Sequence, residues 1–235
     1  MDKGMIRQII LVTDGHSNIG GNPVPAAKEA AEKGIIVNAI GIINPGSSGI
    51  EEVKAVAAAG EGEYQLVQIE NLASSMVMVT LRSIQATLEQ VVSRQLKELV
   101  GSEMKDIPPS ERGKFVDMIE RIQDEIDLKC LILLDTSGSM AGKLETAKES
   151  VLSLFKSLEV RKGRNIIGIM AFPGSGGSAS AVISPFTDNI RSLEKELSRL
   201  KAAGGTPTSL ALRDAVAYLM GEQTKERALL EEQIV

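Results

Sequence analysis

Short apolar runs alternate with helical patterns along most of this chain. Four of the runs have the length and composition of buried strands, at residues 9–12, 35–42, 129–134 and 166–172. The segments between them carry apolar residues at the three-to-four-residue spacing of amphipathic helices. Strands that alternate with helices pair side by side in a parallel sheet, and the helices cover both faces. The pattern therefore predicts an α/β fold.

Two shorter runs complete the expected sheet. Residues 64–67 predict a third strand in the first half of the chain, and residues 181–183 predict an edge strand that ends at Pro185. The total is a six-stranded, mostly parallel and doubly wound sheet of Rossmann-like type.

A long helical region interrupts this alternation. An apolar stripe runs from residue 71 to about residue 100, further than a helix covering a small sheet requires. Pro108 and Pro109 lie in an expected turn at residues 104–110, and a second apolar stripe spans residues 115–126. We expect an inserted helical hairpin at residues 89–128. Its helices could simply pack on each other, or they could form a dimerisation or partner-docking surface.

Composition narrows the class of protein. The formal net charge is -5 and no cluster of Lys and Arg stands out, which favours protein partners over nucleic acid or an anionic membrane. No apolar run approaches the roughly 20 residues of a membrane span. The single cysteine, Cys130, excludes an internal disulfide and is expected to be a buried thiol, which is compatible with a cytoplasmic protein.

Hydroxyl and carboxylate side chains follow two of the expected strands, and a further hydroxyl precedes an expected helix. Asp135, Ser137 and Ser139 form a D-x-S-x-S motif directly after residues 129–134, Asp14 follows residues 9–12, and Thr206 lies in a Gly-Gly-Thr-Pro-Thr segment. Loops at the carboxyl ends of parallel strands gather at one edge of the sheet. Such oxygens suit Mg²⁺, with Mn²⁺ or Ca²⁺ as alternatives. Taken singly, each segment could also be an ordinary turn or helix N-cap.

Together these segments resemble the metal-ion-dependent adhesion site of von Willebrand factor type A (vWA) domains. In that family the D-x-S-x-S loop comes first and the strand with the Asp-Gly loop comes last, whereas Asp14 here precedes the other segments. The chain therefore resembles a circularly permuted vWA domain, similar to vWA-like proteins of spore-forming Firmicutes, and this resemblance implies a bacterial protein associated with sporulation. We expect one domain over residues 1–235. Residues 1–88 would form the C-terminal half of the family pattern, residues 89–128 the hairpin, and residues 129–235 the N-terminal half.

The resemblance implies cation-dependent protein binding. Ser137 and Ser139 would be direct ligands, Asp135 and Asp14 would act mainly through water, and Thr206 would add a third hydroxyl. An acidic side chain of the partner would complete the coordination.

Two other functions stay open. The first is a Mg²⁺- or Mn²⁺-dependent phosphohydrolase, for which the sequence offers no convincing general base, because His16 is expected to be an exposed loop residue. We therefore expect no catalytic residue. The second is a structural module with a vestigial site, which would form a homodimer through the hairpin or through a domain swap of the two halves.

Overall fold

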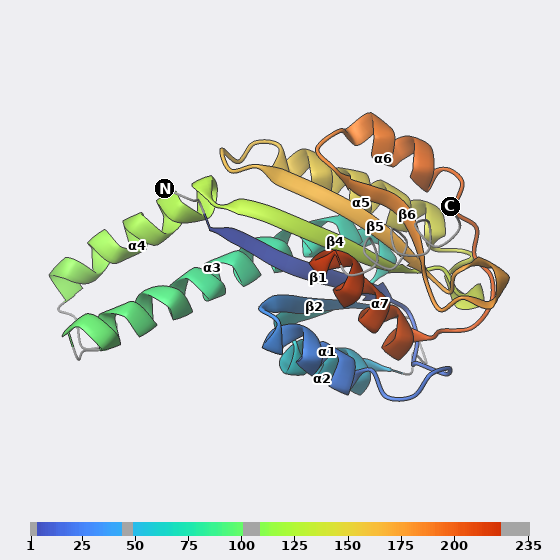
Figure 1. Ribbon diagram of the computed structural model, residues 1–235. Coiled ribbons are helices and arrows are strands. Elements are labelled where there is room, and N and C mark those ends of the chain that lie inside the picture. Colours follow the sequence, from blue (N-terminus) through green and yellow to red (C-terminus); the bar gives the residue numbers. More distant parts are fainter. Residues whose placement is uncertain (1–3, 44–48, 101–108, 222–235) are drawn as a thin grey trace, which may run out of the picture.

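A six-stranded sheet forms the centre of the molecule (Figure 1). The computed structural model describes residues 4–43, 49–100 and 109–221. The strands lie in the order β3-β2-β1-β4-β5-β6, and all neighbours are parallel except β5 and β6. Their bounds are Met5–Thr13 (β1), Ile35–Ile42 (β2), Glu61–Val67 (β3), Asp127–Asp135 (β4), Asn165–Phe172 (β5) and Ala181–Thr187 (β6). The predicted mostly parallel, six-stranded fold is confirmed.

Helices cover both faces of this sheet. One face carries α3 (Leu72–Val100), α5 (Leu144–Leu158) and α6 (Ile190–Leu197), and the other carries α1 (Val24–Glu32), α2 (Ile50–Ala59) and α7 (Thr208–Met220). A further helix, α4 (Pro109–Glu125), lies beside the far part of α3. The arrangement is the doubly wound one expected for strands that alternate with helices.

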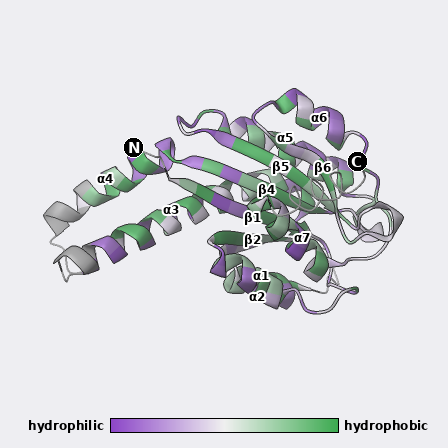
Figure 2. Cartoon of the chain, in the orientation of Figure 1, coloured by the Kyte–Doolittle hydropathy of each residue, from purple (hydrophilic) through white to green (hydrophobic). Residues whose placement is uncertain are grey.

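The central strands are buried on both faces. Along β4, Cys130 and Ile132 pack toward α3 and α5, while Leu131 and Leu133 pack toward α1 and α7. A strand covered on both sides carries a continuous apolar run, which Figure 2 shows as green along β4 and β5. Burial also raises the pKa of the Cys130 thiol to about 12, so the predicted buried thiol is confirmed.

The two helices of the predicted hairpin are both present. The first turns of α3 pack on the sheet through Leu72 and Met76, and its far end projects together with α4 (Figure 1). Most of the turn predicted at residues 104–110 lies outside the described residues. Pro109 and residue 110 are the first residues of α4. Proline is tolerated in the first turn of a helix, because the backbone N–H that it lacks would have no hydrogen-bond partner within the helix. The bounds of the insertion stay a prediction.

The edge strand β6 is longer than the sequence predicts. It continues through Pro185 to Thr187. Its pairing with β5 is antiparallel and shifts register between Ile167 and Ile169, opposite the segment that holds Pro185. Proline has no backbone N–H to donate, and it is tolerated at such an irregular edge position because no second neighbouring strand needs a donor there. The expectation that Pro185 ends the strand was therefore wrong.

None of the helices that the structure describes combines the length and the apolar character needed to cross a lipid bilayer.

Candidate metal site

The central strand β4 ends in a fully buried carboxylate. Oδ1 of Asp135 accepts a hydrogen bond of 2.8 Å from the backbone N–H of Ser137, and Oδ2 accepts one of 2.6 Å from the hydroxyl of Thr13. Thr13 ends β1, and Val12 pairs with Leu134 in the parallel ladder. The ends of two adjacent strands therefore form the floor of the site.

Asp14 meets the two serines just above this floor. Its Oδ1 accepts a hydrogen bond of 2.7 Å from the hydroxyl of Ser139, whose oxygen lies 3.1 Å from the hydroxyl oxygen of Ser137. Its Oδ2 forms an ion pair with the ammonium group of Lys143. The side chain of Asp14 is only 1% exposed and that of Lys143 is 15% exposed. Two carboxylates and two hydroxyls predicted from distant segments thus lie in one hydrogen-bonded cluster.

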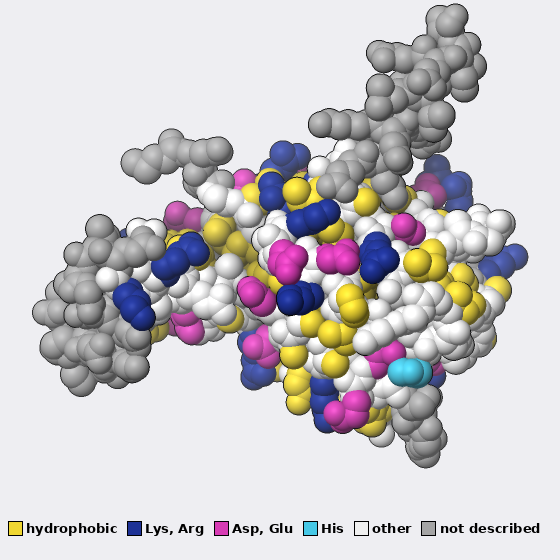
Figure 3. Space-filling view, turned by 60° about the horizontal axis from the view of Figure 1, so that its bottom comes forward, with side chains coloured by type: hydrophobic (Ala, Val, Ile, Leu, Met, Phe, Trp, Pro, Cys, Tyr) yellow, Lys and Arg dark blue, Asp and Glu magenta, His cyan; other side chains and the backbone are white. Residues whose placement is uncertain are grey.

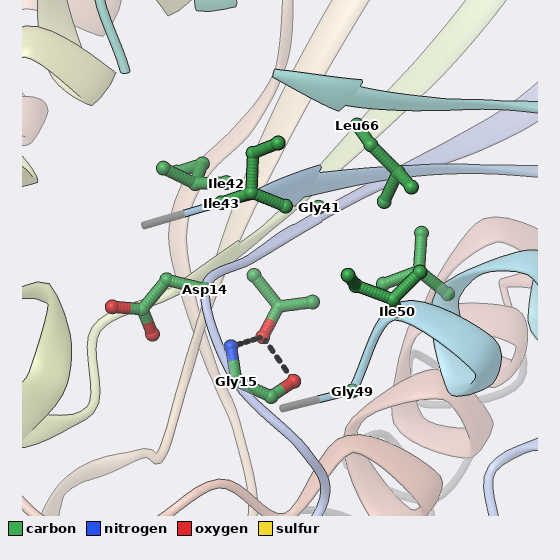
Figure 4. A pocket seen from close by; sticks show the side chains of 10 residues that line it. Asp14, Gly15, Gly41, Ile42, Ile43, Gly49, Ile50 and Leu66 are labelled. Carbon is green, nitrogen blue, oxygen red and sulfur yellow. Dashed lines mark hydrogen bonds between the residues drawn. The ribbon is translucent and has the colours of Figure 1, made fainter. Parts of the chain in front are cut away.

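The side chain of Asp14 points away from a small apolar pocket behind its loop. Figure 4 shows its carboxylate turned away from Ile50 and Leu66, which line that pocket. The pocket has a volume of about 10 Å³, room for about one water molecule at most. The backbone N–H of Gly15 donates a hydrogen bond of 3.3 Å to the hydroxyl of Thr13 and fixes the turn. The loop therefore presents its carboxylate to the serines and not to the pocket.

The loop that holds Thr206 packs directly against the D-x-S-x-S loop. The backbone N–H of Gly138 donates to the carbonyl of Gly204 at 3.0 Å, and the N–H of Ala203 donates to the carbonyl of Thr136 at 2.8 Å. Thr206 itself is buried. Its loop is therefore held in place by the backbone of the D-x-S-x-S segment.

Thr206 is also joined to the segment that follows Asp14. Its backbone N–H donates to Oδ1 of Asn18 at 2.8 Å, and its carbonyl accepts from the backbone N–H of Asn18 at 3.2 Å. All three predicted loops therefore meet at one edge of the sheet. Thr206 joins through its backbone, whereas Asp14, Asp135, Ser137 and Ser139 are linked through their side chains.

The electrostatics of the floor favour a bound cation. Burial raises the pKa of Asp135 to about 6, although the hydrogen bonds from Thr13 and Ser137 oppose this rise, and the charge of Asp14 adds to it. The ionised form of this carboxyl group is destabilised mainly because burial removes its hydration. A divalent cation nearby would stabilise the ionised form and offset this cost.

The donor set fits a hard cation such as Mg²⁺. Neighbouring ligands of an octahedral Mg²⁺ lie about 3 Å apart, because each metal–oxygen bond is about 2.1 Å long. The oxygens of Ser137 and Ser139 are separated by 3.1 Å, which matches this spacing. Within the described part of the chain, no group of three or more His, Cys, Asp and Glu side chains could hold a metal. The candidate site differs from such a group, because hydroxyls supply half of its four linked side chains.

Besides Thr13, three residues at this site were missed by the sequence analysis. Lys143 is one of them, although a lysine just before α5 opposes the helix dipole and so indicates a nearby negative partner. Asn18 and Glu52 are the others. Glu52 anchors the loop after Asp14 by accepting a hydrogen bond of 2.9 Å from the backbone N–H of Ser17. Neither residue carries a local signal, because each is defined by a contact with a distant segment.

His16 is exposed, as predicted, and its Nδ1 lies 2.9 Å from Oε2 of Glu52. This contact adds a second link between the loop after Asp14 and α2. It does not involve the serines of the site.

Two comparisons with known proteins decide the family. The von Willebrand factor type A domain family matches residues 130–230 of this chain. An uncharacterized protein of Bacillus subtilis (strain 168), YabS, is 37% identical over 220 residues, which cover 92% of this chain and 89% of that protein. The chain belongs to the vWA family.

A solved structure has the same fold. The crystal structure of an uncharacterized protein from Alicyclobacillus acidocaldarius subsp. acidocaldarius DSM 446 is 39% identical, with a TM-score of 0.86. The match covers 94% of this chain and 96% of that one. The region that matches the vWA family begins within β4, so it includes the D-x-S-x-S and Thr206 loops and leaves β1 and Asp14 outside. The predicted family is confirmed, whereas the predicted link to sporulation stays a prediction.

Proposed function

We propose that this vWA protein is a metal-ion-dependent protein-interaction module. Ser137 and Ser139 would bind the cation directly, Asp135 and Asp14 would hold its water ligands, and Thr206 would provide a third hydroxyl. Mg²⁺ is the cation we favour, with Mn²⁺ and Ca²⁺ as alternatives. When bound, the cation supplies a Lewis-acidic position at which a carboxylate of another protein completes the coordination.

One contact carries this proposal. The hydroxyl of Ser139 lies within hydrogen-bond distance of both Ser137 and Asp14, at 3.1 Å and 2.7 Å, although Asp14 is 125 positions away in sequence. Chance turns and N-caps in separate loops would not need to converge in this way. Convergence of hydroxyls and a carboxylate is what a shared cation requires.

The chain's own residues hold the metal-binding groups in place before a cation or a partner binds. Thr13 and the backbone of Ser137 hold the carboxylate of Asp135 in one orientation, so little reordering is needed when a cation binds. Because two hydroxyl ligands are neutral, a divalent cation there keeps enough charge to attract an acidic side chain of the partner.

We also propose that the vWA domain is circularly permuted. β1, which leads into Asp14, pairs with β4, which ends at Asp135, although two strands and the hairpin separate them in the chain. The family match that starts within β4 supports the same idea. Under this proposal the two halves of the family pattern occur in exchanged order within a single domain of residues 1–235.

A protein is the partner class we favour. On the face seen in Figure 3, basic and acidic side chains are interspersed and do not gather by sign, which does not resemble the basic tracks that follow nucleic-acid backbones. We further propose a cytoplasmic location, since the fully buried thiol of Cys130 suits a reducing compartment.

We propose binding rather than catalysis as the role of the cation. The imidazole of His16 pairs with Glu52 and is directed to α2, so it supports no general-base role toward Ser137. Phosphatase assays with Mg²⁺ and Mn²⁺ provide the test. Turnover that disappears in Asp135→Ala would overturn this part of the proposal and favour a phosphohydrolase.

Calorimetric titration of Mg²⁺ and Mn²⁺ tests the metal site directly. We expect binding to the wild type, and loss of binding in Ser139→Ala and in Asp14→Asn. Ser153→Ala is the matched control, because Ser153 donates only to the carbonyl of Glu149 on the exposed side of α5. Equal binding in the wild type and Ser139→Ala would remove this site from the proposal, and loss in Ser139→Ala alone would remove Asp14 from the site.

A further inference from the structure

Lys143 places a positive charge inside the candidate metal site. Its ammonium group pairs with Oδ2 of Asp14, while the hydroxyl of Ser139 donates to Oδ1, so both oxygens of this carboxylate are engaged. The pair is almost fully buried on the Asp14 side, where the side chain is 1% exposed. Water and salt therefore screen this interaction only weakly.

The position of Lys143 in the chain makes this contact informative. It is the residue immediately before α5, where the backbone N–H groups of the helix already create a positive field. A lysine there is unfavourable for the helix unless a carboxylate offsets its charge. Asp14, which β1 brings from 129 positions away, is a carboxylate in contact with it.

The same carboxylate of Asp14 is needed for two tasks. In the proposed metal site, Asp14 orients water ligands of the cation, and at the same time it pairs with the ammonium group of Lys143. A divalent cation and an ammonium group that share one carboxylate repel each other strongly even at the effective dielectric constant of a protein surface. Binding of the cation therefore has to displace or weaken the lysine contact.

We propose that Lys143 is a built-in competitor of the divalent cation for Asp14, and that the exchange of ammonium for metal sets the affinity of the site. This inference rests on the metal-binding function proposed above. It assigns a role to a residue of α5 that the motif itself does not include.

The exchange has two consequences of opposite sign. Without metal, Lys143 compensates the buried carboxylate of Asp14 and stabilises the fold. With metal, the same charge opposes binding. A lysine with a merely structural role would lower both stability and metal affinity when replaced, so measuring both quantities distinguishes the two cases.

Lys143→Met is the variant to test, because methionine keeps an unbranched apolar stem and removes the charge. Lys143→Arg keeps the charge, and Lys28→Met removes a charge from the exposed side of α1 as the matched control. The affinity for Mg²⁺ and Mn²⁺ would be measured by calorimetry, and thermal unfolding would be followed in EDTA. We expect Lys143→Met to bind Mg²⁺ about tenfold more tightly or better. In EDTA its midpoint of unfolding should fall by about 2–4 °C or more, while both controls stay close to the wild type.

The possible outcomes distinguish a failure of this inference from a failure of the proposed function. Tighter binding with lower stability in EDTA supports the exchange. Equal affinity in the wild type and Lys143→Met overturns the exchange and leaves the metal site in place. Binding only in Lys143→Met supports the competition but overturns metal binding by the natural protein. No binding in either variant overturns both.

Discussion

The hydroxyl of Thr13 donates a hydrogen bond of 2.6 Å to Oδ2 of Asp135, across 122 positions of sequence. The two residues end neighbouring parallel strands, β1 and β4. This one contact therefore couples the register of the central pair of strands to the orientation of the buried carboxylate in the candidate metal site.

Replacing Thr13 by valine should destabilise the protein. Valine has nearly the same shape but lacks the hydroxyl, so Oδ2 of Asp135 would lose this donor while staying buried. The expected loss is about 1–3 kcal/mol in the free energy of unfolding, measured with urea at pH 8 in EDTA. Thr13→Ser keeps the hydroxyl and should retain most of the stability. Equal stabilities of the valine variant and the wild type would show that the hydrogen bond is not formed in solution.

Stability in the absence of metal should fall as the pH rises through the titration of Asp135. Its pKa is raised from 3.8 to about 6 in the folded protein, so between these values the folded state binds more protons than the unfolded state. The unfolding free energy therefore decreases from about pH 4 to about pH 6, by about 3 kcal/mol for a shift of this size. Urea unfolding in EDTA at a series of pH values would measure it.

Asp135→Asn provides the reference for that measurement, because asparagine does not titrate. The wild type should lose stability relative to this variant as the pH rises, and added Mg²⁺ should reduce the loss by compensating the ionised carboxylate. Parallel pH profiles of the two proteins would mean that Asp135 titrates at its ordinary pKa.

Gly204 should tolerate no side chain. Its φ of +81° lies in the left-handed region, and a Cβ atom there would lie 2.9 Å from Cγ of Pro173. Gly204→Ala should cost about 1–3 kcal/mol of stability and weaken Mg²⁺ binding, because the carbonyl of Gly204 positions the loop of Gly138. Gly142→Ala is the matched control, since a Cβ atom there meets nothing within 4 Å. The same loss in both variants would mean that the backbone of Gly204 plays no special part.

Most of the fold could be predicted from the sequence. The apolar runs of β1, β2, β4 and β5 are continuous because both faces of these strands are covered, and such runs are easy to recognise. The edges of the sheet were less predictable. β3 begins at Glu61, ahead of the apolar residues that predicted it, and β6 continues through Pro185. An edge strand packs less tightly, so its sequence carries a weaker pattern.

The side chains of the candidate site were predictable only in part. Asp135, Ser137 and Ser139 form a local motif that can be recognised directly, and strand order then suggests where Asp14 lies. The contacts of Lys143, Thr13 and Glu52 depend on the detailed approach of separate loops. No local pattern in the sequence contains that information.

The α3–α4 hairpin supplies the last prediction, because it exposes apolar side chains where it projects from the sheet. Val91, Val116 and Met118 are 42%, 47% and 38% exposed, whereas Ile119 packs into the core. If the hairpin forms a homodimer, replacing these three exposed residues by glutamine should reduce the mass in solution from two chains to one, as measured by light scattering at several concentrations. Val182→Gln is the control, since Val182 is 39% exposed on the edge strand β6 and not on the hairpin. A wild type with the mass of one chain would exclude a hairpin dimer. A dimer that survives the triple substitution would favour exchange of the two halves between chains, because a swapped sheet is held by β1 and β4 and not by exposed residues of the hairpin.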